Sequence, residues 1–222
     1  MRVRSILFAA AGVLALLGQA KADNITFIIS EDGGPPTTIV TGVNTSTIGP
    51  FTFGDFNISA ITGSTEGFLP PPDILQANQI DVSTNTTGNH TLTIAILGTN
   101  LNSPLGLTNL DSQFDATGIT PGWSVAELTQ INGVNLAVAA NFLTVGGQQF
   151  VDTATLSPNF TAAGIIAIST NGIAGSSNTG LTIEAAPVPG PLAGAGIPGL
   201  LAGFGLFGGY QWKRRKSVVA AA

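Results

Sequence analysis

The side chain best suited to general acid–base chemistry is His90, the single histidine of the chain. A Ser–His–Asp hydrolase needs such an imidazole as its base, together with a serine that usually sits within Gly-x-Ser-x-Gly. The stretch Gly122-Trp123-Ser124-Val125-Ala126 lacks the second glycine of that pattern. A zinc site would have to combine His90 with carboxylates only, which is an unusual ligand set. We therefore expect His90 to be an ordinary surface or edge residue, and we predict no catalytic residue and no metal ligand.

Paired carboxylates could hydrolyse glycosidic bonds without a histidine, provided that they converge to about 5–9.5 Å. Asp111 and Asp115, within NLDSQFDATG, are the most closely spaced pair after Glu31 and Asp32. A solvated loop is the simpler explanation of this pair. Calcium could use the carboxylate, Asn and carbonyl oxygens of the loops, but the sequence has no Asp-x-Asp-x-Asp-Gly loop. We expect no cofactor and no enzymatic activity.

Aromatic platforms are a third kind of functional group, because sugar-binding faces often use them. Between Asp23 and Ala186 the chain has Trp123 and nine phenylalanines but no tyrosine. Phenylalanine more often fills a hydrophobic core than a binding face. Trp123 could stack on a sugar ring, but we expect it to lie in a core between sheets.

Charge is sorted along the chain. The seven Lys and Arg residues lie at the two ends, whereas all 12 carboxylates lie between Asp23 and Glu184. The formal net charge of −5 therefore hides a middle segment of about −12. Such a segment repels phosphate backbones, which nucleic-acid-binding proteins neutralise with Lys and Arg. We therefore expect no nucleic-acid partner. The chain also has no cysteine, which excludes disulfides and thiolate chemistry.

The segments that must position the histidine, the carboxylates and the aromatic residues have the sequence pattern of β-strands. Residues 23–186 have the length of one domain, and apolar residues alternate with polar ones in five segments: Ile25–Ile29, Phe56–Ala60, Ile80–Val82, Leu92–Ile96 and Leu181–Glu184. Turn-forming stretches lie between them, namely Glu31–Gly34, Pro70–Pro72 and Thr87–Asn89. Ser124 and Glu127 have capping-box spacing, but their segment alternates equally well and we favour a strand. The pattern predicts a mainly β fold, a single antiparallel β-sandwich over residues 23–186.

The N-terminus has the three parts of a secretory signal peptide. Arg2 and Arg4 precede the apolar run Ile6–Leu17, and Ala20 and Ala22 stand at the positions that a signal peptidase inspects. The apolar run would rise about 18 Å as a helix, too short to cross a bilayer core of about 30 Å. We predict a signal peptide over residues 1–22, with Asp23 as the first residue of the mature chain; a buried N-terminal helix is the alternative.

The C-terminal segment, residues 187–216, has the composition of a membrane anchor. Residues 192–212 carry no charge and would span about 31 Å as a helix. The cluster Lys213, Arg214, Arg215 and Lys216 follows directly and would stop translocation, leaving the short tail 217–222 inside. The positive-inside rule then places residues 23–186 outside the inner membrane. A glycine-rich loop packed on the domain is the alternative.

This C-terminal order resembles the PEP-CTERM sorting signal of Gram-negative bacteria. Val188-Pro189-Gly190-Pro191, the glycine-rich apolar span and the basic cluster match its three parts, with Gly190 where the family's motif has Glu. The resemblance covers about the last thirty residues. It implies recognition by a membrane-embedded exosortase, processing for release or surface attachment, and a setting in which exopolysaccharide is made. Plain membrane anchoring is the alternative to cleavage.

Three functions are compatible with these features. The first is an exported, non-enzymatic cell-surface or extracellular-matrix protein that is sorted together with exopolysaccharide. The second is a surface module that binds carbohydrate, calcium or ice. The third is a secreted hydrolase, which would need two carboxylates converging in one cleft.

Overall fold

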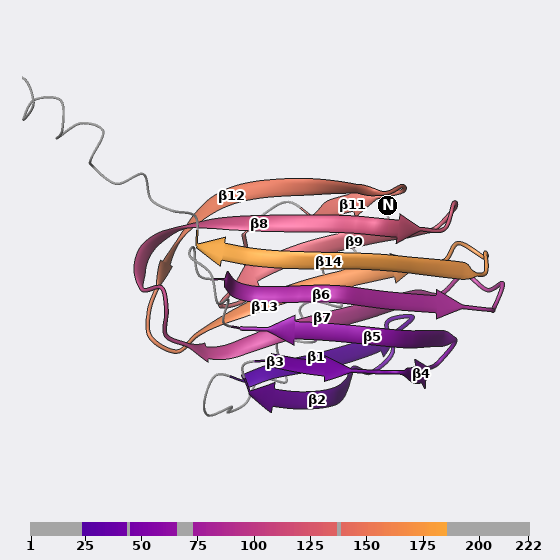
Figure 1. The fold of residues 1–222 in the computed structure, drawn as a ribbon, viewed down its shortest axis with the longest axis horizontal. Helices are drawn as coiled ribbons and strands as arrows, with labels where there is room; N and C mark the ends of the chain where they lie inside the picture. The colour runs from indigo at the N-terminus through magenta and orange to yellow at the C-terminus, as the bar shows by residue number, and fades with distance from the viewer. Residues whose placement is uncertain (1–23, 44, 66–72, 137–138, 186–222) are drawn as a thin grey trace, which may run out of the picture. The chain divides into compact units, whose positions relative to one another are not determined.

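The computed structural model describes residues 24–43, 45–65, 73–136 and 139–185 (Figure 1). The expected signal peptide, the motif Val188–Pro191, the span 192–212 and the basic cluster 213–216 lie outside these residues. In the part that the structure describes, every regular element is a strand, and none is a helix of the length and hydropathy needed to cross a membrane.

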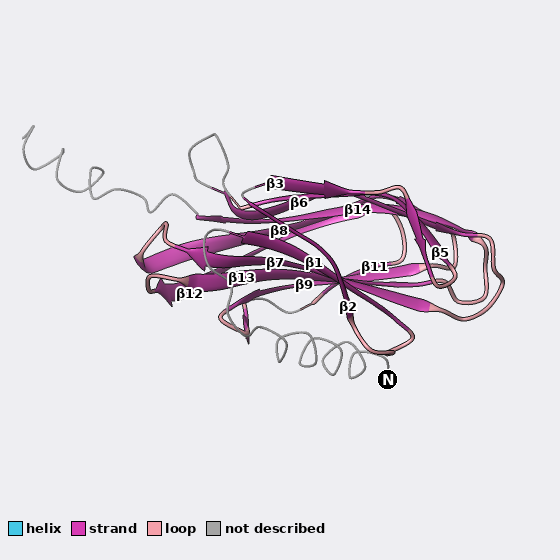
Figure 2. Cartoon of the chain, turned by 90° about the horizontal axis from the view of Figure 1, so that it is seen from below, coloured by secondary structure: helices cyan, strands magenta, loops and turns pink. Residues whose placement is uncertain are grey.

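Two antiparallel sheets of seven strands each make up the domain. Sheet A contains, in spatial order, β10 (Val134–Asn135), β9 (Ser124–Ile131), β13 (Phe160–Ser169), β7 (Thr91–Leu101), β1 (Asn24–Glu31) and β2 (Thr37–Val43), with β11 (Ala140–Phe142) also paired to β9. Sheet B contains β12 (Gly146–Leu156), β8 (Gly106–Ile119), β14 (Gly175–Ala185), β6 (Asp73–Thr84), β5 (Phe56–Ser64) and β3 (Thr45–Ile48), with β4 (Phe51–Phe53) also paired to β5. Figure 2 shows one sheet lying over the other. The predicted mainly β, antiparallel sandwich is confirmed.

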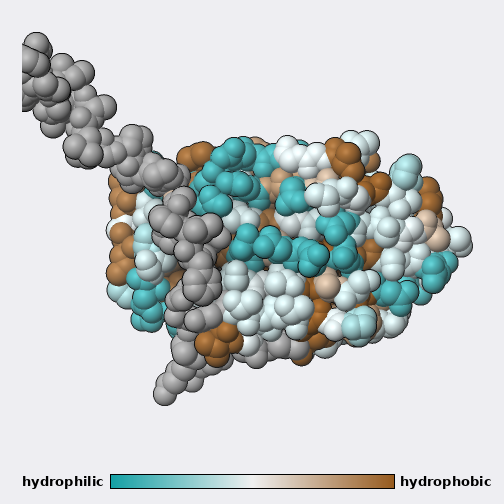
Figure 3. Space-filling view, in the orientation of Figure 1, coloured by the Kyte–Doolittle hydropathy of each residue, from teal (hydrophilic) through white to brown (hydrophobic). Residues whose placement is uncertain are grey.

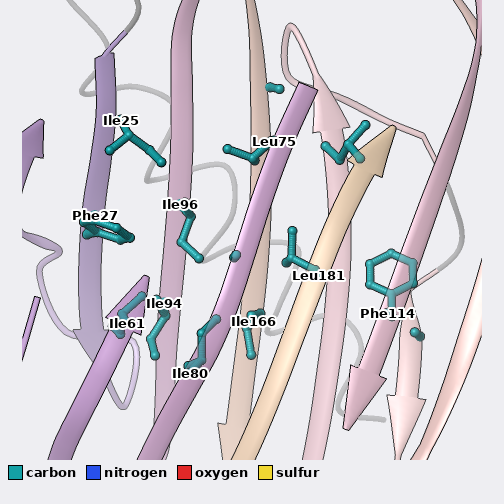
Figure 4. Close-up of a cluster of buried hydrophobic side chains, with 14 of the residues drawn as sticks. Ile25, Phe27, Ile61, Leu75, Ile80, Ile94, Ile96, Phe114, Ile166 and Leu181 are labelled. Atoms are coloured by element: carbon teal, nitrogen blue, oxygen red, sulfur yellow. The ribbon is translucent and has the colours of Figure 1, made fainter. Parts of the chain in front are cut away.

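The core fills the space between the sheets. Because side chains alternate between the two faces of a strand, Ile25, Phe27 and Ile29 of β1 all point inward and are fully buried. Figure 4 shows Ile94 and Ile96 of sheet A among the inward side chains of sheet B. Burial of each such side chain contributes about 1.5–3 kcal/mol. Without disulfides, this burial is the main source of stability.

The strands that the sequence predicted all occur. The five alternating segments lie in β1, β5, β6, β7 and β14, and the ambiguous segment from Ser124 to Gln130 is strand β9. Asp81 lies on the outer face, because its neighbours Ile80 and Val82 point into the core. Trp123 is a core residue, fully buried, and its Nε1–H donates to the carbonyl oxygen of Ile173 at 2.7 Å.

Sheet A carries buried apolar side chains on both faces. Ile28, Ala95, Ile165 and Leu128 face one another in register across β1, β7, β13 and β9 and form a second hydrophobic cluster. This row points away from sheet B, since Phe27 and Ile29 on either side of Ile28 point toward it. The two outer faces of the sandwich therefore differ, because the outer face of sheet B carries mainly polar side chains, with Leu107 and Val151 exposed among them.

Candidate functional site

A continuous row of neutral polar side chains crosses the outer face of sheet B. The register places one such residue on each of six adjacent strands: Gln149 (β12), Gln113 (β8), Thr182 (β14), Gln76 (β6), Ser64 (β5) and Thr45 (β3). All six are exposed or partly exposed. We call these six residues the polar row. Figure 3 shows the face on which it lies, with hydrophilic residues gathered over the middle strands.

Carboxylates flank the polar row on both sides, with Asp111 and Glu184 on one side and Asp115 on the other. Asp111 of β8 lies directly opposite Glu184 of β14, a pairing of like charges that is destabilising unless it is compensated. The amide of Gln113 compensates it, because Nε2 lies 3.3 Å from Asp111 Oδ2 and 3.3 Å from Glu184 Oε2. Gln149 Nε2 also donates to Asp111 Oδ2. The amides of the row therefore hold two carboxylates in place.

A second polar site lies inside the sandwich, around Glu127. Its side chain points from β9 toward β14 and is fully buried. Thr179 Oγ1 hydrogen-bonds to Glu127 Oε1 and lies 2.7 Å from the carbonyl oxygen of Asp115. One hydroxyl proton cannot serve two acceptors. The arrangement is satisfied when Glu127 is protonated and donates to Thr179, which then donates to the carbonyl of Asp115.

Burial supports the protonated form of Glu127. Desolvation raises the pKa of Glu127 to about 8; the hydrogen bond with Thr179 lowers it, and the charge of Asp115 raises it further. Glu127 Oε2 has no hydrogen-bond partner among the described residues. Beside it, Ser112 of β8 hydrogen-bonds to Thr129 of β9 at 2.7 Å. A thin polar layer therefore crosses an otherwise apolar core.

A third polar group forms where three segments meet at one end of the sandwich. Glu31 ends β1, Asp32 follows it, Asp55 lies between β4 and β5, and His90 directly precedes β7. The ring of His90 places Nδ1 3.0 Å from Asp32 Oδ2 and 3.7 Å from Glu31 Oε1, and Nε2 3.3 Å from Asp55 Oδ2. The hydrogen bond to Asp32 raises the pKa of His90; burial opposes this rise, and the charges of Asp55, Asp32 and Glu31 add to it. We call these four residues the His90 cluster.

The backbone holds the His90 cluster in shape. The amide of Asp55 donates to both carboxylate oxygens of Glu31, at 3.1 and 3.3 Å, and the amide of Thr91 donates to Asp32 Oδ1 at 2.8 Å. Gly54, at a φ of 55°, leaves the space that the Glu31 carboxylate occupies, since a Cβ there would overlap it. Backbone amides therefore hold the carboxylates of Glu31 and Asp32 before any ligand arrives.

The structure separates the residues that a hydrolase would have to bring together. Asp111 and Asp115 both lie on β8, four residues apart on the same face, which corresponds to about 13 Å along a strand. This separation exceeds the range for paired glycosidase carboxylates. Trp123 lies in the core and shares no face with the polar row. The signal-cleavage residues Ala20, Ala22 and Asp23 lie outside the described residues, as do the sorting and stop residues.

His90 is partly exposed, as expected of a surface residue, but it lies among three carboxylates. One feature of the sequence could have indicated this cluster: Glu31 and Asp32 stand at the end of one predicted strand, and His90 stands at the start of another. Only the antiparallel pairing of β1 with β7, which aligns Glu31 with Leu92, brings the two ends together. The polar row was also not predicted, since its members come from six strands whose order differs from the order of the sequence.

Comparisons with known proteins identify no family. No family model matches the sequence, and no curated protein matches it. Among solved structures, a CBM35 from Paenibacillus barcinonensis is 16% identical, with a TM-score of 0.28, over 64% of this chain and 94% of that one. A family 35 carbohydrate-binding module from Clostridium thermocellum is 17% identical, with a TM-score of 0.29, over 50% and 91%. TmCBM61 in complex with β-1,4-galactotriose is 8% identical, with a TM-score of 0.34, over 72% and 88%. Structural similarity at this level supports no conclusion about function.

Proposed function

We propose that the chain is an exported, non-enzymatic surface protein whose β-sandwich binds neutral polysaccharide along the polar row of sheet B. The observation that carries this proposal is the row itself, six adjacent strands that each present an amide or a hydroxyl to solvent. The hydroxyls and the amide of Gln76 can donate as well as accept a hydrogen bond. Gln113 and Gln149 offer mainly their amide oxygens as acceptors, because their Nε2 groups already donate to Asp111 and Glu184. These donors and acceptors together match the hydroxyl groups of an uncharged sugar.

The dimensions of the row suit an extended polymer. Neighbouring strands lie about 4.8 Å apart, so six strands present hydrogen-bonding groups over about 24 Å. A glycan chain laid across the strands would meet one polar side chain at every step. A small ligand would use only part of the row.

Charge favours a neutral polymer over an acidic one. Residues 24–185 contain no Lys or Arg, and carboxylates such as Asp111 and Glu184 flank the row. Like charges repel at this range unless salt screens them. We therefore expect uronic-acid polymers to be excluded, together with nucleic acids.

Binding along the row is expected to be weak at each site. Its members are amides and hydroxyls, and the tryptophan of the domain, Trp123, is in the core. A hydrogen bond exposed to water contributes only about 0.5–1.5 kcal/mol net. Retention on a polysaccharide would therefore depend on several contacts along one chain, which suits a matrix protein better than a receptor for single sugars.

Sorting is the second half of the proposal and is supported by the sequence of residues 187–216. Export by the N-terminal signal, anchoring by the span 192–212 and processing at Val188–Pro191 by an exosortase-like enzyme would deliver the domain to the cell surface. Mass spectrometry of the protein from its host tests this part. An intact chain from Asp23 to Ala222 in the inner membrane would exclude processing and leave the anchor.

Substitutions at the centre of the row test the binding proposal. We expect the full chain to be retarded in gels that contain soluble β-glucan or galactan, and not in gels that contain alginate. The double variant Gln76→Ala/Thr182→Ala removes two hydrogen-bonding groups and should weaken retention about tenfold. The matched control is Thr153→Ala/Thr155→Ala, two exposed residues of β12 off the row, which should bind as the wild type does. The proposal would be rejected if the two double variants were retarded equally, or if neither β-glucan nor galactan retarded the wild type.

A further inference from the structure

We propose that Glu31, Asp55 and His90 form a binding site for one divalent transition-metal ion, with zinc the best match. One donor atom from each residue lies within 4.8 Å of the donors of the other two. The set joins one imidazole nitrogen to two carboxylate oxygens, which are ligand types that zinc binds, although a set with a single histidine is unusual. With three protein ligands, a tetrahedral ion keeps one position for water or another ligand.

The distance between two of the donors fits this geometry. Zinc binds imidazole nitrogen and carboxylate oxygen at about 2.0–2.2 Å, so two ligands of one tetrahedral ion lie about 3.3–3.5 Å apart. His90 Nε2 and Asp55 Oδ2 are 3.3 Å apart, longer than the usual N–H···O hydrogen bond of about 2.9–3.0 Å. The two atoms therefore stand at the separation of two ligands on a shared ion.

Asp32 supplies the support that a metal-binding histidine needs. Its Oδ2 lies 3.0 Å from His90 Nδ1, and its Oδ1 is held by the amide of Thr91. A histidine that donates Nδ1–H to a carboxylate presents the lone pair of Nε2, and this arrangement is typical of zinc ligands. Asp32 is therefore a positioning residue, and the ring edge of His90 also packs against Phe56 at a centroid distance of 6.5 Å.

The charge of the cluster is an independent reason to expect a cation. Three carboxylates face one imidazole, so the group keeps a net charge of about −2 even when His90 is protonated. A nearby Lys or Arg could balance such a group. Residues 24–185 contain none, so nothing else in the domain can supply that charge. A bound divalent ion would.

The ion would join the two sheets at one end of the sandwich. Glu31 and His90 belong to sheet A through β1 and β7, whereas Asp55 precedes β5 of sheet B. In a chain without cysteine, such a cross-link would take the place of a disulfide. Because the folded protein would bind the ion and the unfolded chain would not, zinc should raise the unfolding temperature.

Zinc titration of the purified full chain, first stripped with a chelator, tests the site. We expect one zinc per chain by calorimetry, and a rise in the unfolding temperature of roughly 5–10 °C at a hundredfold excess over the dissociation constant. His90→Gln and Asp55→Asn should each abolish this rise. Asp152→Asn, an exposed carboxylate on β12 away from the cluster, should keep it. Circular dichroism of each stripped variant checks that it is folded.

Cobalt substitution gives a second readout that does not depend on stability. A tetrahedral cobalt ion with nitrogen and oxygen ligands should give visible absorption bands that disappear in His90→Gln. Zinc binding that survives His90→Gln would overturn the proposal. Stabilisation by calcium but not by zinc, equal in wild type and His90→Gln, would do the same, because it would place an oxygen-only site elsewhere.

Discussion

Glu127 and Glu31 both lie in sheet A, but the domain neutralises their charges in different ways. Glu127 lies between the sheets, where its partner is the hydroxyl of Thr179. Glu31 lies at one end of the sandwich, where it meets an imidazole, a backbone amide and two further carboxylates. The interior site compensates a carboxyl with a proton, whereas the carboxylates of the His90 cluster meet an imidazole and backbone amides.

The difference follows from solvation. Transferring a carboxylate into an apolar interior costs several kcal/mol, and a group without a counter-charge takes up a proton instead. At the partly exposed His90 cluster, water and hydrogen bonds stabilise the charges, and a cation can reach them. Since residues 24–185 contain no Lys or Arg, no ion pair with a basic side chain of the domain is open to either site.

The largest effect that separates the two sites is the pH dependence of Glu127. Its folded-state pKa of about 8 lies above the ordinary value of 4.5, so between these values the folded protein holds a proton that the unfolded chain has lost. Raising the pH through this window should lower the free energy of unfolding, by about 3–5 kcal/mol over the whole range. Glu127→Gln should remove this loss, as measured by urea unfolding from pH 4.5 to 9 in the presence of a chelator.

The control for this prediction is Asp152→Asn, which makes the same chemical change at an exposed position of β12. Its free energy of unfolding should depend on pH as that of the wild type does. Parallel profiles for Glu127→Gln and the wild type would show that Glu127 is ionised in the folded state. The contrast between the two sites would then be lost.

The hydroxyl of Thr179 gives the next largest effect. Thr179→Val keeps the shape of the side chain but removes the group that pairs with Glu127, so a buried acid is left unsatisfied at a cost of about 1–3 kcal/mol. Thr182→Val, on the outer face of the same strand, should change the free energy of unfolding by less than about 0.5 kcal/mol. If both variants lower the free energy of unfolding equally, the loss comes from placing valine in strand β14 and not from removing the hydrogen bond with Glu127.

The strands could be predicted because their signal is local. In Ile25-Thr26-Phe27-Ile28-Ile29 the alternation identifies one buried face directly. The same stretch did not predict that Ile28 would also be buried, because burial of the second face depends on its neighbours Ala95 and Ile165. Local pattern therefore predicts the strand, and the packing of several strands determines which faces are covered.

The sites could not be predicted in the same way. Glu127 alternates with Val125 and Ile131 on one side of β9, but Ala126 and Leu128 make the other side equally apolar. The sequence therefore did not show which side faces the core. The His90 cluster requires β1 to pair with β7, with five strands lying between them in the chain. No short stretch of the sequence predicts the pairing of β1 with β7.

Asp32 provides the smallest and most specific test of the contrast. Asp32→Asn keeps the size of the side chain, but it removes the charge that orients the ring and leaves one acceptor oxygen for two donors, His90 Nδ1 and the amide of Thr91. If Asp32 positions His90 for an ion, the variant should bind zinc about 10–100-fold more weakly, the range for losing such a support. Stability of the metal-stripped protein should change little, since Asp32 is half exposed. The reverse pattern, unchanged zinc affinity with lowered stability in the chelator, would make Asp32 a partner of a protonated His90. The surface site would then compensate its charge with a proton, as the interior site does.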